Sequence, residues 1–162
     1  MTFDIRRFEE RQTQDLINLS IRAWTPVFVE LMTTTSDQFV LNAFYPSGWK
    51  ARQVADIQAL LEDESCTVWT AQTDDHLVGF IGLRSHPEDA MGEIHIIAVD
   101  PDQQRNGVAT ALMSFASDEF RRGGLKMVMV ETGGDPGHEP SRAAYESFGF
   151  HPWPVARYFK EL

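Results

Sequence analysis

The sequence predicts a single α/β domain built on a mixed β-sheet, and three observations support this. The chain has 162 residues, 43% of them hydrophobic and 23% charged, which is enough for one hydrophobic core in one domain, residues 1–162. Residues 66–99 hold three strand-like segments with short connections, which predicts antiparallel neighbours. A helix-like run at 109–122 then leads to an apolar segment at 127–132, and such a crossover predicts a parallel strand pair. We therefore expect a mostly antiparallel central sheet that contains one parallel pair and has flanking helices.

The first part of the chain predicts a short strand followed by helices. Residues 3–6 alternate between apolar and polar side chains, as a strand does. Thr13 is a candidate cap for a helix from residue 14 to about residue 28. Residues 30–48 suggest a short helix with a loop, and residues 49–61 a further helix with one apolar side.

The rest of the chain supplies the remaining strands and two helices. The expected strands are residues 66–72, 77–84 and 91–99, with a turn at 73–75 and a loop at 85–90. The run at 127–132 is typical of a buried central strand that lies parallel to 91–99. A helix at 140–148 should stop at Gly149, and residues 150–157 and 158–162 read as closing strands broken by Pro152 and Pro154.

The overall composition excludes several classes of protein. A net charge of −10 argues against a broad nucleic-acid surface, because such a surface needs clustered Lys and Arg. No segment is apolar for long enough to span a membrane, and the first residues lack the apolar centre of a signal peptide, so we expect a cytoplasmic protein. The single cysteine, Cys66, lies in an alternating strand-like segment, which predicts a buried and inert thiol.

The junction at residues 96–110 carries the clearest functional signal. An apolar strand runs through a turn into the first turn of an amphipathic helix. The first amides of a helix lack intrahelical acceptors and carry the positive end of the helix dipole, so they form a binding site for a phosphate or pyrophosphate. Gly107 and Ala109 leave the backbone open to close approach by an anion.

Two motifs give this loop a family context. Gln104-Arg105-Asn106-Gly107-Val108-Ala109 resembles the acetyl-CoA loop of the GNAT acetyltransferases, and the helix that ends Tyr145-Glu146-Ser147-Phe148-Gly149-Phe150 resembles their second signature. The resemblance is strong over residues 79–150. It implies the GNAT fold, with acetyl-CoA as co-substrate and N-acetyltransferase activity. It also implies that the strands at 91–99 and 127–132 diverge at their carboxyl ends and hold the pantetheine arm between them.

The resemblance also suggests the catalytic groups. Glu93 matches the position of the general base in lysine-acetylating members, and an apolar neighbourhood would raise its pKa and make it a better base. Strand alternation would place Glu93, His95 and Ile97 on one face, which makes His95 a second candidate base. The alternative is a solvated glutamate at a strand end. Tyr145 is the candidate general acid that protonates the departing thiolate.

Further residues are expected to hold the cofactor. By resemblance, a bulge at Ile97 would turn its amide toward the thioester oxygen, and Val99 would pair with the pantetheine amides. His138 stands where the family often has an asparagine that contacts the cofactor. The expected cofactor-binding set is Ile97, Ala98, Val99, Gln104, Arg105, Asn106, Gly107, Val108, Ala109, Thr110, His138, Ser141 and Arg142. No metal site is expected, because the spacing of Asp135, His138 and Glu139 matches no common one.

The acceptor is less well defined by the sequence. A small-molecule amine is favoured over a protein lysine or N-terminus, because the aromatic region at residues 24–49 would close an open peptide groove. A non-catalytic acyl-CoA-binding module is an alternative reading, and a mononucleotide-binding protein is disfavoured because the loop lacks a Gly-Lys-Ser/Thr ending. We expect no nucleic-acid or membrane partner, and the family resemblance suggests a possible homodimer.

Overall fold

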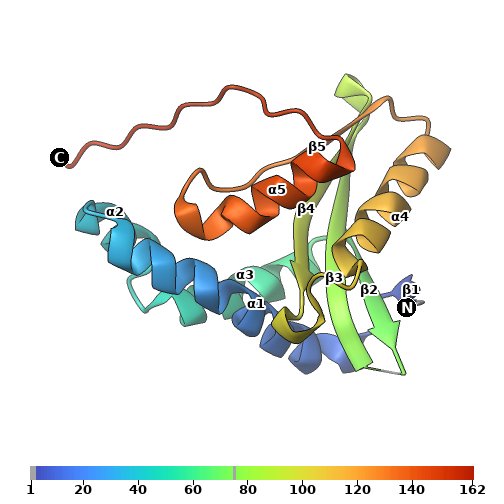
Figure 1. The fold of residues 1–162 in the computed structure, drawn as a ribbon, viewed down its shortest axis with the longest axis horizontal. Helices are drawn as coiled ribbons and strands as arrows, with labels where there is room; N and C mark the ends of the chain where they lie inside the picture. Colours follow the sequence, from blue (N-terminus) through green and yellow to red (C-terminus); the bar gives the residue numbers. More distant parts are fainter. Residues whose placement is uncertain (1–2, 75) are drawn as a thin grey trace.

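The computed structural model describes residues 3–74 and 76–162, which form a five-stranded sheet in the order β1-β2-β3-β4-β5 (Figure 1). The first four strands are antiparallel neighbours, and β5 is parallel to β4. This confirms the predicted mixed sheet. The strand bounds are Asp4–Arg7 (β1), Thr67–Thr73 (β2), His76–His86 (β3), Met91–Val99 (β4) and Met127–Val130 (β5).

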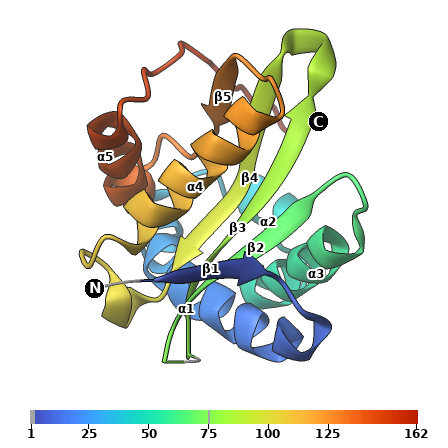
Figure 2. The ribbon, with the colours of Figure 1, turned by 90° about the vertical axis from the view of Figure 1, so that its right-hand side faces the viewer.

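Helices cover both faces of the sheet (Figure 2). On one face α1 and α3 pack against the sheet, and on the other face α4 and α5 do so. No helix among the described residues is both long enough and apolar enough to cross a membrane. The helices are α1 (Thr13–Thr34), α2 (Gln38–Phe44), α3 (Trp49–Glu62), α4 (Val108–Arg122) and α5 (Glu139–Phe148).

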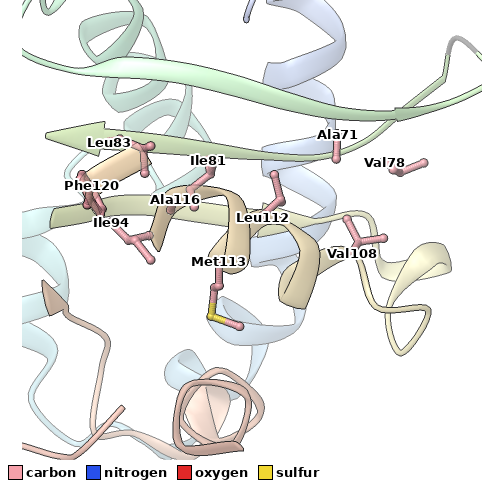
Figure 3. Close-up of a cluster of buried hydrophobic side chains, with 10 residues drawn as sticks. All are labelled: Ala71, Val78, Ile81, Leu83, Ile94, Val108, Leu112, Met113, Ala116 and Phe120. Atoms are coloured by element: carbon pink, nitrogen blue, oxygen red, sulfur yellow. The ribbon is translucent and has the colours of Figure 1, made fainter. Parts of the chain in front are cut away.

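The larger core cluster lies under α4 (Figure 3). Leu112, Met113 and Ala116 of the helix are at most 1% exposed and pack on side chains of the sheet. The ring of Phe120 rests directly on the backbone of Gly92, where an added Cβ would lie 2.3 Å from the Phe120 ring carbon Cγ. Burial of large side chains of this kind stabilises a domain by about 3–5 kcal/mol each when measured by truncation to alanine. This packing fixes α4, and therefore its N-terminus, relative to β4.

The N-terminal part of the fold differs from the prediction in two details. Thr13 does not cap α1, because Gln12 occupies the cap position and the Thr13 hydroxyl instead donates to the carbonyl of Glu10 at 2.7 Å. The helix also continues through Pro26 to Thr34 rather than ending near residue 28. The predicted β2–β3 turn is observed as far as Asp74, while Asp75 lies outside the described residues.

The predicted closing strands are wrong. Residues 149–162 form no helix or strand, although Gly149 does end α5 with a φ of 105° as expected. Pro152 and Pro154 have no amide hydrogen to give to a strand ladder, which explains why this segment does not pair. As a consequence β5 is an edge strand rather than a central one as predicted, and Met127 is 52% exposed.

Candidate functional site

A cleft of about 630 Å³ opens between the carboxyl-terminal half of β4 and the end of β5. It continues toward α1 and α3 on one side and toward α5 on the other. The residues that line it include Trp24, Arg52, Asp56, Asp63, Arg84, His95, Ile96, Ile97, Ala98, Val99, Gln104, Glu131, Thr132, His138, Ser141 and Tyr145.

The cleft exists because β4 and β5 diverge. Their parallel pairing runs from Met91–Met127 to Ile94–Val130 and stops there, while β4 continues to Val99. Beyond Ile94 the β5-facing edge of β4 is therefore free, and both strand ends line the cleft. This confirms the expected divergence of the two strands at their carboxyl ends.

A β-bulge in β4 determines which side chains face the cleft. Gly82 pairs with Ile96 and Leu83 with Ile94, so His95 is an extra residue in the ladder. The extra residue reverses the alternation, so that Ile97 packs toward α4 and α5 whereas Ile96 packs toward α1 and α3.

The bulge corrects two expectations from the sequence. The irregularity lies at His95, two residues before the expected position at Ile97. Glu93 and His95 do come together, since His95 Nδ1 lies 2.8 Å from Glu93 Oε1. Ile97 does not share their face, because one additional residue shifts a period-2 pattern to the opposite side of the sheet.

Glu93 is enclosed by two histidines. Its Oε2 lies 2.6 Å from His86 Nε2, and its side chain is only 15% exposed. Burial acts to raise the pKa of Glu93, but hydrogen bonds from His86 and His95 outweigh burial and hold that pKa below its ordinary value. The expected increase in the pKa of Glu93 is therefore wrong. His95, rather than Glu93, lines the cleft.

Arg84 links this cluster to α3. Its Nη1 lies 3.0 Å from His95 Nδ1, and its Nη2 donates to Asp63 Oδ2 at 2.5 Å. The Ser65 hydroxyl donates to the other Asp63 oxygen at 2.6 Å, as does the Ser65 amide. The hydrogen bonds from Ser65 and then Arg84 lower the pKa of Asp63 to about 2. Asp63 therefore remains a carboxylate and tethers Arg84 beside the cleft.

Tyr145 lines the cleft from α5. Its ring packs edge-on against Phe150, with 6.0 Å between the ring centroids, and contacts the core under α4. Burial raises the pKa of Tyr145 to about 12. The phenol therefore keeps its proton at neutral pH and can act as a donor.

The loop between β4 and α4 has the geometry that an anion site requires. Arg105 and Gly107 have positive φ angles of 64° and 85°, and Gly107 is the residue before the first turn of α4. The Ala111 amide donates to Gly107 O at 2.9 Å, so the amides of residues 108–110 precede the first intrahelical hydrogen bond. Gln104 lines the cleft, and Arg105 and Asn106 are exposed. The Val108 side chain is buried and anchors the helix.

The loop before α5 is held by its own side chains. His138 Nδ1 lies 2.7 Å from Asp135 Oδ1, while His138 and Ser141 line the cleft. Arg142 Nη1 donates to the carbonyls of Gly133 and Asp135 at 2.6 and 2.8 Å. Arg142 thus supports the loop, and its expected contact with a cofactor stays a prediction.

Arg84, His86 and Asp63 are part of the site but were not predicted from the sequence. The available signal was the pair of alternating sequences Arg84-Ser85-His86 and Glu93-Ile94-His95 on strands joined by a short loop. Side chains two residues apart on one strand share a face, so both pairs lie together once the register is known. Within the described part of the chain, no three His, Cys, Asp or Glu side chains are placed to hold a metal ion.

Comparison with known proteins agrees with this geometry. A mycothiol acetyltransferase from Kocuria rhizophila is 34% identical over 88 residues, which cover 52% of this chain and 28% of the relative. The N-acetyltransferase YsnE from Bacillus subtilis is 32% identical over 90 residues, which cover 56% of this chain and 59% of the relative. The chain thus spans less than a third of that mycothiol acetyltransferase.

Solved structures share the fold at low sequence identity. The PaiA N-acetyltransferase from Thermoplasma acidophilum, crystallised with coenzyme A, has a TM-score of 0.69 at 15% identity over 96% of this chain and 94% of its own. The aminoglycoside acetyltransferase AAC(6')-Iy, in complex with a bisubstrate analogue, has a TM-score of 0.66 at 15% identity over 100% and 99%. The model of the Acetyltransferase (GNAT) family matches residues 35–150. The chain therefore belongs to the GNAT acetyltransferase family.

Proposed function

We propose that this protein is an acetyl-CoA-dependent N-acetyltransferase that acts on the primary amine of a small molecule. The observation that carries the proposal is the cleft between β4 and β5, which is lined by Tyr145 and by Gln104, the residue just before the loop with the free amides. Membership of the GNAT family supports acetyl-CoA as the cofactor. The crystal structure of the PaiA N-acetyltransferase in complex with coenzyme A supports the same choice. The names of the mycothiol and aminoglycoside acetyltransferases support a small-molecule acceptor.

We assign binding of the cofactor pyrophosphate to the loop before α4. Within the described part of the chain, the amides of residues 105–110 have no backbone acceptor, and they lie at the positive end of the helix dipole. Arg105 is exposed beside them and adds a positive charge for a phosphate oxygen. The free edge of β4 from Ile97 to Val99 would pair with the pantetheine amides, with His138 and Ser141 on the opposite wall.

His138 is suited to accept a hydrogen bond from the pantetheine. Its Nδ1 is 2.7 Å from the carboxylate of Asp135, which favours a proton on that nitrogen. The neutral ring then presents Nε2 as an acceptor. The asparagine that is common in the family offers both a donor and an acceptor, whereas His138 offers the cofactor only an acceptor.

The chemistry follows from the groups in the cleft. A bound ammonium gives its proton to the Glu93–His95 pair, of which His95 contacts the cleft. The free amine attacks the thioester carbon, a C–N bond forms, and the backbone amide of Ile97 stabilises the oxyanion. The intermediate expels the thiolate, and Tyr145 donates its proton to the sulfur. The attacking nitrogen then loses its second proton, which returns through water to the Tyr145 phenolate and restores the phenol. The products are the N-acetylated amine and coenzyme A.

The acceptor end of the cleft is polar and charged. One face of α3 contributes Arg52 and Asp56, which form an ion pair at 2.8 Å, and Asp63 follows the helix. Glu131, which follows β5, also lines the cleft. Phe28 stacks on Trp49 at 4.5 Å, so these two aromatic rings join α1 to α3 as packing residues. Trp24 is the aromatic residue of this region that lines the cleft.

A homodimer and a cytoplasmic location are part of the proposal. The open edge of β5 and the exposed side chains of Trp153 and Val155 are features that a second copy would cover. A single cysteine in the whole sequence fits a reducing compartment.

The test is a screen of amines for thiol release from acetyl-CoA, together with calorimetry of coenzyme A binding. We expect release with at least one small amine, and a loss of roughly 10²–10⁴-fold in kcat for Glu93→Gln and Tyr145→Phe. The matched controls are Glu64→Gln and Tyr158→Phe, whose side chains are exposed and do not line the cleft. Coenzyme A binding without any turnover would favour the non-catalytic module. A preference for peptide amines would favour a protein acceptor, and no coenzyme A binding would overturn the assignment.

A further inference from the structure

Four charged or titratable side chains form a cross-strand cluster at the joined ends of β3 and β4. Arg84 and His86 project from one face of β3, and Glu93 is the direct partner of Arg84 in the ladder. His95, displaced by the bulge, completes the cluster and reaches the cleft. The cluster contains one base candidate in contact with the cleft and one carboxylate enclosed behind it.

Two neighbours of His95 require opposite protonation states of its Nδ1 atom. Glu93 Oε1 lies 2.8 Å from Nδ1, and Arg84 Nη1 lies 3.0 Å from the same atom. A carboxylate only accepts hydrogen bonds and a guanidinium only donates them. Nδ1 must therefore carry a proton to satisfy Glu93 and must lack one to satisfy Arg84.

The choice between these states determines what His95 offers to the cleft. In a neutral imidazole with the proton on Nδ1, Nε2 has a free lone pair and can take a proton from a substrate amine. With the proton on Nε2, the ring presents a donor and cannot act as a base. The competition between Glu93 and Arg84 is thus a competition between an active and an inactive tautomer.

We propose that His86 is a positioning residue that decides this competition in favour of the active tautomer. Its Nε2 lies 2.6 Å from Glu93 Oε2, opposite the oxygen that faces His95, so it fixes the carboxylate with Oε1 directed at Nδ1. The inference rests on the proposed acetyltransferase function and goes beyond it by assigning a role to a residue outside the cleft lining.

The surrounding groups are consistent with this role. Arg84 is tethered on its far side by Asp63 at 2.5 Å, which keeps it from moving fully onto His95. Glu88 Oε1 lies 3.8 Å from His86 Nδ1 at the surface, so a second carboxylate faces the other nitrogen of the ring. During the reaction the ammonium proton moves to His95 Nε2, and the resulting imidazolium is stabilised by the Glu93 carboxylate until it returns its proton to water.

The first test reads the tautomer directly, without any need for activity. In protein labelled with ¹⁵N-histidine, we expect His95 to carry its proton on Nδ1 at neutral pH. His86→Leu removes the anchor and should move the proton to Nε2, whereas His86→Gln keeps an N–H donor and should retain the Nδ1 state. Adding Arg84→Met to His86→Leu removes the competitor and should restore the Nδ1 tautomer.

The second test is kinetic. We expect His86→Leu to lower kcat at least tenfold, as part of the roughly 10²–10⁴-fold that a general base contributes, with the affinity for coenzyme A unchanged. His86→Gln should recover most of that loss, which a merely structural role would not predict. His151→Gln, at an exposed histidine beyond α5, is the control.

The outcomes separate this inference from the proposed function. An unchanged Nδ1 tautomer in folded His86→Leu, or a kcat within twofold of the unaltered protein, overturns the role of His86. If His86→Leu does not fold, the same tautomer and rate comparison with His86→Ala, which also lacks an N–H donor, decides the matter. Absence of thiol release in the unaltered protein would instead overturn the acetyltransferase assignment, while the tautomer measurement would still report on the cluster.

Discussion

The guanidinium of Arg22 on α1 forms an ion pair with the carboxylate of Asp100, the residue that directly follows β4. The side chain of Asp100 is 12% exposed, and its second oxygen accepts the amide of Asp102 at 3.0 Å. The Asp100 amide in turn donates to Val78 O at 2.9 Å. One carboxylate thus fixes the start of the anion-binding loop to the sheet and to α1.

Replacing Asp100 by alanine should weaken cofactor binding without blocking the chemistry. The loop before α4 would lose its attachment and would have to be ordered when the ligand binds. We expect the Kd for coenzyme A to rise about tenfold, which corresponds to about 1.4 kcal/mol, with kcat at saturating cofactor little changed. Calorimetry measures the first quantity and thiol release the second. Asp102→Ala, at an exposed position in the same loop, is the control.

Alanine substitutions at the two glycines that flank α4 distinguish the effect of backbone strain from the effect of contact with the ligand. Gly107 before the helix and Gly124 after it have φ angles of 85° and 77°, and a Cβ added to either glycine would have no atom within 4 Å. Alanine at either position should destabilise the fold by about 1–2 kcal/mol, because L-residues disfavour this conformation. Only Gly107→Ala should also weaken coenzyme A binding, since its Cβ would face the phosphate. Equal affinities for the two variants would argue against the loop as the pyrophosphate site.

Stability at alkaline pH should depend on Tyr145. Burial raises its pKa from 10.0 to about 12, so the unfolded chain releases the phenolic proton at lower pH than the folded protein does. The stabilisation that Tyr145 provides is complete below pH 10 and is lost as the pH rises toward 12. Relative to Tyr145→Phe, we expect the unaltered protein to lose about 1 kcal/mol between pH 9 and pH 11. Denaturant unfolding at a series of pH values measures this difference, and a constant difference would contradict it.

The thiol of Cys66 should be unreactive in the folded protein. Burial raises its pKa to about 11, and the side chain lies in the core beneath α1 and α3. At pH 8 little thiolate is present, so labelling with a disulfide reagent should be slow in the native state and rapid after unfolding. The labelling kinetics with and without denaturant provide the measurement. Rapid native labelling would show that this core opens locally.

Much of the fold follows from patterns within single segments. The predicted bounds of β4 match the observed ones, Met91–Val99, because a strand-like segment is bounded by the loop that ends at Ala90 and by an Asp-Pro sequence. The start of α4 and the end of α5 agree with the prediction to within one residue, because glycines mark both positions. Local signals of this kind do not depend on tertiary contacts.

The errors concern features that depend on pairing. The bulge at His95 is a property of the β3–β4 register, and no residue type in β4 indicates it. Residues 150–162 have the composition of strands, yet whether they pair depends on a partner edge and on amides that the prolines lack. For the same reason, the contacts of His86 and Arg84 with Glu93 and His95 appear only when the two strands are placed side by side.

The extra residue in β4 separates the proton-transfer group from the packing of the core. Because Ile94 and Ile96 already pair with consecutive residues of β3, loss of His95 would leave a regular ladder with Ile97 still toward α4 and Ala98 still toward α1. Evolution can therefore replace or remove the residue at position 95 without rebuilding either layer of the core.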